Sequence, residues 1–177
     1  MDTDYTTLLL PTKVPELLGK ILENLHEQAL VQLKEEGEVM PVIMAFSPQE
    51  NAKVKVFVYP VGSLMNSSNN KEIIRMMMEE TIQKDEVTIV LLITEAWLLK
   101  LPAKNVTKKE VLQIRPSEHP DKEEVVLVNI MTKTEQLIAN AKIYRDPVSL
   151  DKFDLVSLTG ESEGTLVRDE EDTPKIH

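Results

Sequence analysis

The fold is decided by residues 87–93, Val-Thr-Ile-Val-Leu-Leu-Ile, which are almost continuously apolar. A strand with one wet face alternates apolar and polar residues, whereas a strand covered on both faces is apolar throughout. Glu95 and Trp97 follow at the point where this run ends. We therefore predict a central strand that leaves the core at Glu95.

Working outward from this strand, hydrophobic periodicity predicts two helices and further strands. A first helix follows Pro15, carries an apolar stripe at three- and four-residue steps, and ends before Gly37; a second runs from Asn69 to about Asp85. Period-two and Val-rich segments predict the other strands at 39–46, 53–59, 124–131 and 135–144, with 153–158 as a short strand or docking segment.

These elements predict an α+β fold of order α-β-β-α-β-β-β. Short connections between neighbouring strands favour an antiparallel-dominated sheet of about five strands, with the two main helices packed on one face. We expect residues 1–159 to form a single domain, followed by an acidic C-terminal tail at 160–177.

Composition excludes several classes of protein. The chain has 177 residues, a formal net charge of −10 and no cysteine. The charge argues against nucleic-acid and anionic-membrane partners, and the lack of cysteine rules out disulfides and thiolate chemistry. The scattered glycines cannot form a P-loop or a dinucleotide-binding motif, so we expect no nucleotide and no cofactor. Neither a signal-peptide pattern nor a run of about 20 apolar residues is present, which favours a cytoplasmic location.

The first candidate site is the end of the central strand. A carboxylate at this position, Glu95, is either a satisfied structural group or a binding group. Trp97 is the chain's only tryptophan, a residue type that anchors ligands and partners but also fills cores. Both interpretations stay open from the sequence.

The second candidate site is the proline-braced loop 115–121, within the long connection 100–122. It carries Arg115, Glu118, His119 and Asp121. His119 with the neighbouring carboxylates and Glu95 could perform acid–base work or hold a metal, but no metal-ligand spacing such as HxH is present, so we assign no metal site. The alternative is a stiff, solvated surface turn. Four lysines in the same connection form a basic cluster that could meet an acidic partner: Lys100, Lys104, Lys108 and Lys109.

Short motifs resemble those of a group of small bacterial and phage proteins of unassigned activity. They are Gly37-Glu38-Val39 with Pro41, Glu95-Ala96-Trp97, and the stretch 115–120 leading into Glu124. No function follows from this resemblance. The order of elements is similar to roadblock and profilin-like folds, whose members are often scaffolds or regulators that dimerise, and this likeness concerns the fold alone.

The leading hypothesis is a non-enzymatic binding or regulatory protein that acts through a protein or small-ligand surface. The alternative is a metal-dependent or acid–base hydrolase-like enzyme that uses the Glu95–Trp97 corner and the loop 115–121. A third possibility is self-association by edge-strand pairing.

Overall fold

The computed structural model describes residues 5–9, 13–50, 52–65, 68–99 and 116–157. Over these residues the chain forms two α-helices, two short 3-10 helices and a sheet of eight strands. In chain order the elements are β1 (Tyr5–Leu9), α1 (Val14–Glu35), β2 (Val42–Pro48), β3 (Lys53–Pro60), η1 (Gly62–Leu64), α2 (Ser68–Ile82), β4 (Ile89–Leu98), η2 (Pro116–Glu118), β5 (Glu123–Thr132), β6 (Gln136–Arg145), β7 (Val148–Leu150) and β8 (Asp154–Ser157).

The strands form an antiparallel sheet in the order β1-β3-β2-β4-β5-β6-β7. β8 also pairs with β6, on the edge that β5 leaves free, so β7 and β8 share that edge. β4 is central, as its apolar run predicts, and it pairs with β2 on one side and β5 on the other. The predicted α+β class and antiparallel sheet are therefore confirmed.

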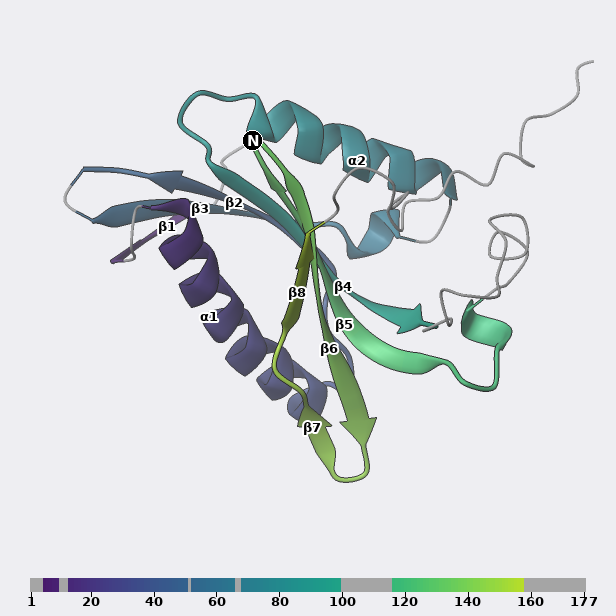
Figure 1. Ribbon diagram of the computed structural model, residues 1–177. Helices are drawn as coiled ribbons and strands as arrows, with labels where there is room; N and C mark the ends of the chain where they lie inside the picture. Colours follow the sequence, from purple (N-terminus) through teal and green to yellow (C-terminus); the bar gives the residue numbers. More distant parts are fainter. Residues whose placement is uncertain (1–4, 10–12, 51, 66–67, 100–115, 158–177) are drawn as a thin grey trace, which may run out of the picture.

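The two helices cover opposite faces of the sheet, which corrects the prediction that both pack on one face (Figure 1). The alternation along β4 gives the reason. Ile89, Leu91 and Ile93 pack in the cluster beneath α1, while Val90 and Leu92 pack in the cluster beneath α2. A run that is apolar at every position needs a cover on each face.

α1 buries the stripe that the sequence predicts. Its fully or nearly buried residues recur every three or four positions and are Leu17, Leu18, Ile21, Leu25, Ala29 and Leu33. The helix ends as predicted at Gly37, which adopts φ +82° and donates its N–H to the carbonyl of Gln32. His26 Nε2 donates to the Leu150 carbonyl at 3.1 Å and joins α1 to β7.

The sheet has more strands than the predicted five because β1 and β7 escape the periodicity argument. Each is short, and a strand of three to five residues offers few alternating positions. The predicted domain boundary, the acidic tail and the basic cluster lie outside the described residues. No helix among those described is long and apolar enough to cross a membrane.

Candidate functional site

The second half of β4, residues 94–98, pairs with a described strand on one side only. β5 pairs with β4 along its whole length, from Ile89 to Leu98. β2 pairs with β4 only from Ile89 to Ile93, because Val42, the first residue of β2, lies opposite Ile93. In Figure 1 the arrowhead of β4 accordingly lies beside β5. Within the described part of the chain, residues 94–98 therefore form a free half-edge, which we call the β4 edge.

The hairpin β5–β6 shows which backbone groups face this edge. Thr132 N–H donates to the Glu135 carbonyl at 2.9 Å. In a regular antiparallel ladder each residue directs its N–H and C=O to one side, and successive residues alternate. The even-numbered residues of β5 thus bond to β6, and the odd-numbered residues bond to β4.

The register then assigns the groups of β4. The odd-numbered residues of β5 lie opposite the even-numbered residues of β4, so Thr94, Ala96 and Leu98 bond to β5. Glu95 and Trp97 direct their N–H and C=O groups outward, across the β4 edge. The Glu95 carbonyl supports this assignment, since it accepts a hydrogen bond from the Thr94 hydroxyl at 3.1 Å.

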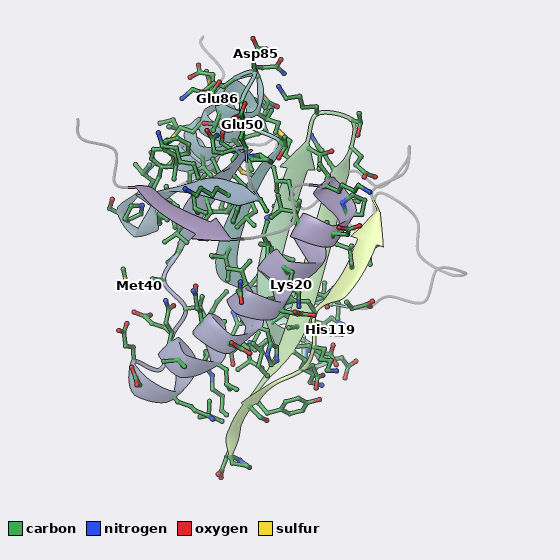
Figure 2. The ribbon with its side chains drawn as sticks, turned by 90° about the vertical axis from the view of Figure 1, so that its left-hand side faces the viewer. Lys20, Met40, Glu50, Asp85, Glu86 and His119 are labelled. Carbon is green, nitrogen blue, oxygen red and sulfur yellow. The ribbon has the colours of Figure 1, made fainter. Side chains whose placement is uncertain are left out.

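The segment before β2 explains why the edge is open. The N–H of Val39 donates to Glu95 Oε1 at 2.7 Å, and that of Met40 donates to the side-chain oxygen of Gln32 at 3.0 Å. Val61 N–H donates to the Pro41 carbonyl, so odd-numbered residues of this segment bond to β3 and even-numbered residues face β4. Met40 is therefore the next residue that would bond to β4, opposite Glu95. Its N–H is engaged by Gln32 instead, and the predicted strand 39–46 begins only at Val42. Figure 2 shows Met40 next to the C-terminal end of α1, where 47% of the residue is exposed.

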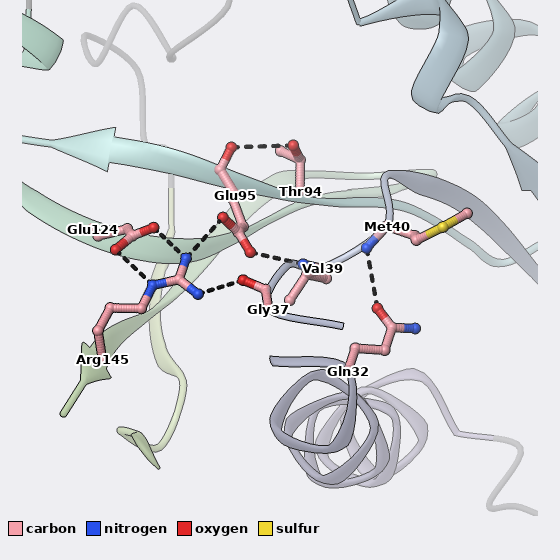
Figure 3. Close-up of polar contacts among 8 residues, drawn as sticks. All are labelled: Gln32, Gly37, Val39, Met40, Thr94, Glu95, Glu124 and Arg145. Carbon is pink, nitrogen blue, oxygen red and sulfur yellow. Dashed lines mark hydrogen bonds and ion pairs between the residues drawn. The ribbon is translucent and has the colours of Figure 1, made fainter. Parts of the chain in front are cut away.

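Glu95 belongs to a polar network that joins three parts of the chain (Figure 3). Its second carboxylate oxygen lies 3.3 Å from the guanidinium of Arg145, at the end of β6. The same guanidinium donates to Glu124 on β5, with Arg145 Nε 3.0 Å from Glu124 Oε2, and to the Gly37 carbonyl after α1. Arg145 thus ties the helix end to the sheet.

The network also acts on the ionisation of its cation. The hydrogen bond to Glu124 is the main cause that raises the pKa of the Arg145 guanidinium above its ordinary value, and Glu95 adds to the effect. Glu95 is therefore engaged by a backbone donor and by a permanent cation. Such an arrangement favours a structural carboxylate that shapes the corner over a catalytic one.

Trp97 lies on the same face of the sheet as Glu95, two residues further along β4. It remains 44% exposed. The ammonium of Lys122 lies 4.4 Å from the centroid of the indole ring and also donates to the Ser117 carbonyl. Lys122 thereby holds the described part of the loop, residues 116–121, against the Trp97 ring.

The loop itself forms a turn rather than a ligand cage. η2 covers Pro116–Glu118, and His119 Nδ1 accepts the N–H of Asp121 at 3.1 Å. The Asp121 carboxylate is largely exposed. Among the described residues no three His, Asp or Glu side chains are grouped so that they could hold a metal. Arg115 lies outside the described residues.

The two predicted site regions meet through Lys122, which no sequence motif marks. Lys122 connects Trp97 to the loop, and Arg145 connects Glu95 to Glu124. Neither cation carries a local signal, because its partners lie on other strands. The Glu123–Lys142 ion pair on the neighbouring strands was missed for the same reason.

Comparison of the chain with known protein families, with curated proteins and with solved structures finds no match. The resemblances in motif and element order stay predictions.

Proposed function

We propose that this protein is a non-enzymatic interaction module that binds an extended segment of a partner protein along the β4 edge. The observation that carries this proposal is that the backbone N–H and C=O groups of Glu95 and Trp97 point away from β5. They point to a side on which this half of β4 has no described neighbour. In β-strand addition, main-chain hydrogen bonds supply affinity and side-chain contacts supply specificity.

The edge has the dimensions of a short recognition site. Residues 94–98 span about 17 Å of extended chain. A partner strand would bond to Glu95 and Trp97, and its side chains would alternate between the two faces. Continuing the antiparallel sheet is the simplest geometry, since the partner then takes the path that β2 leaves at Val42.

Trp97 is the natural anchor of such a contact. It combines a large apolar surface with partial exposure beside the unpaired backbone. Tryptophan is enriched among the few residues that dominate binding energy at protein interfaces. Lys122 fixes the ring from one side, so little side-chain entropy remains to be lost when a partner packs on it.

The polar groups of the corner support binding over catalysis. Glu95, the carboxylate of the enzymatic alternative, already accepts the Val39 N–H and pairs with Arg145. His119 is turned toward the Asp121 amide. Both groups have tasks in shaping the surface, and neither needs a substrate to complete its contacts.

Replacing Trp97 by alanine is expected to weaken binding of edge-pairing peptides by about 30-fold or more, the effect of an interface hot spot. The experiment is selection of peptides from a random display library on the wild-type protein. Affinities of the enriched peptides are then measured on wild type and Trp97→Ala.

Tyr144→Ala is the matched control. Tyr144 is an aromatic residue of similar exposure, 42%, on β6. Replacing Tyr144 should leave the affinities unchanged. When an enriched peptide binds, the amide chemical shifts of Glu95 and Trp97 should change. Failure to enrich any peptide, or enriched peptides that bind Trp97→Ala as well as wild type, would contradict the proposal.

A further inference from the structure

We infer that the segment bound at the β4 edge is cationic, with lysine or arginine alternating with apolar residues. This inference rests on the proposed function and names the chemistry of the partner. Its basis is the charge that the fold places around the edge.

The C-terminal end of α1 presents a concentration of carboxylates. Glu35, Glu36 and Glu38 are exposed, and among the described residues none of them forms an ion pair. Lys34 is the only basic residue in the last turn. The helix macrodipole adds partial negative charge at the same end. The end of α1 therefore attracts cations.

This negative end adjoins the β4 edge. The N–H of Val39, next to Glu38, donates to the Glu95 side chain at 2.7 Å. The Gly37 carbonyl, between Glu36 and Glu38, accepts from Arg145 (Figure 3). Glu38 thus precedes a residue that contacts Glu95 directly, and Glu36 and Glu38 flank a carbonyl that is joined to Glu95 through Arg145.

The cation already present does not neutralise these acids. Arg145 contacts the end of α1 only at the Gly37 carbonyl, and its ion pairs are with Glu95 and Glu124. Within the described residues Glu36 and Glu38 therefore keep their charge for an external partner. Lys122 is placed over the Trp97 ring. A second cation on that ring would meet the charge of Lys122, so the partner residue beside Trp97 should be apolar. An alternating cationic and apolar segment satisfies both conditions.

A second copy of the chain fits this edge poorly. Pairing two β4 edges would bring the Glu36 and Glu38 carboxylates of both copies together, and each chain carries a net charge of −10. Like charges at such an interface reduce affinity and association rate. The charge therefore favours a basic partner over self-association.

Three synthetic peptides test the inference directly, each alternating valine with lysine, glutamine or glutamate. Their binding is followed by the amide shifts of Glu95 and Trp97. We expect the lysine–valine peptide to bind at least about fivefold more tightly than the glutamine–valine peptide, and the glutamate–valine peptide to bind most weakly. N-methylation of alternate amides in the lysine–valine peptide should abolish binding, which separates strand pairing from general charge attraction.

The double variant Glu36→Gln, Glu38→Gln should reduce the preference for lysine over glutamine to about twofold or less. The matched control, Glu16→Gln with Glu27→Gln, removes the same charge further along α1 and should keep the preference. Glu27 lies about 14 Å from Glu36 along the helix, beyond the Debye length of about 8 Å at physiological salt.

The outcomes separate the two proposals. Equal binding of the three peptides at Glu95 and Trp97, or a preference for glutamate, would contradict the inference that the partner is cationic. It would still agree with the proposal that the β4 edge binds an extended segment. No shift at these amides with any peptide overturns both. A concentration-dependent dimer that is lost in Trp97→Ala would assign the edge to a second copy and contradict the inference.

Discussion

Replacing Leu92 by alanine is expected to lower the free energy of unfolding by about 2 to 5 kcal/mol, as for other large-to-small changes in a packed core. Leu92 is 3% exposed and belongs to the cluster beneath α2. Leu91, its neighbour, is 0% exposed and belongs to the cluster beneath α1. Leu91→Ala should cost a similar amount, measured by urea or thermal unfolding.

The pair tests the two-sided sheet. If both helices covered one face, one of these neighbouring residues would face water, and its truncation would change stability by no more than about 0.5 kcal/mol. A large loss for Leu91→Ala with no loss for Leu92→Ala would contradict the position of α2.

Replacing Arg145 by alanine is expected to lower stability by about 1 to 3 kcal/mol. The change removes the cation shared by Glu95 and Glu124 and the donor to the Gly37 carbonyl. The partial exposure of the guanidinium, 39%, keeps the expected loss below that of a fully buried ion pair. Arg145→Lys should recover only part of it, because an ammonium cannot reproduce the planar fork.

Lys20→Ala is the control for Arg145→Ala. Lys20 pairs with Glu23 on the exposed side of α1, and both side chains are mostly solvent-accessible. Its loss should produce no measurable shift of the unfolding midpoint. Equal effects of the two substitutions would show that the Arg145 network does not tie α1 to the sheet.

Local pattern predicted most elements because their cores lie on single stripes. The spacing of Leu17, Ile21 and Leu25 identified α1, and Gly37 marked its end. The prediction that both helices pack on one face was wrong. The continuously apolar run 87–93 already required cover on both faces of the sheet. The strands on either side of β4 cover its edges and not its faces, so each face is left for a helix to cover.

α2 shows where helical periodicity alone misleads. Ile73 and Ile74 both fit an apolar stripe at helical spacing, yet Ile73 is exposed, and the buried line consists of Ile74, Met78 and Ile82. Two neighbouring isoleucines satisfy the same spacing, and only the position of the sheet selects between them. The three consecutive methionines divide in the same way: Met78 is buried, Met77 packs against the core, and Met76 is exposed.

The candidate site could be located from the sequence but not constructed from it. Glu95 and Trp97 stand out because charge and an aromatic ring end an apolar strand. The free edge depends on contacts with residues distant in the sequence. Gln32 accepts the N–H of Met40, and Glu95 accepts the N–H of Val39. Such contacts join residues 8 and 56 positions apart, and no local motif reports them.

Amide hydrogen exchange of the free protein, resolved by residue, tests the β4 edge most directly. We expect an alternation: Glu95 and Trp97, whose N–H groups face outward, exchange about a hundredfold or more faster than Thr94 and Ala96, which bond to β5. Equal protection of all four amides, or the opposite alternation, would contradict the free edge on which the proposed function rests.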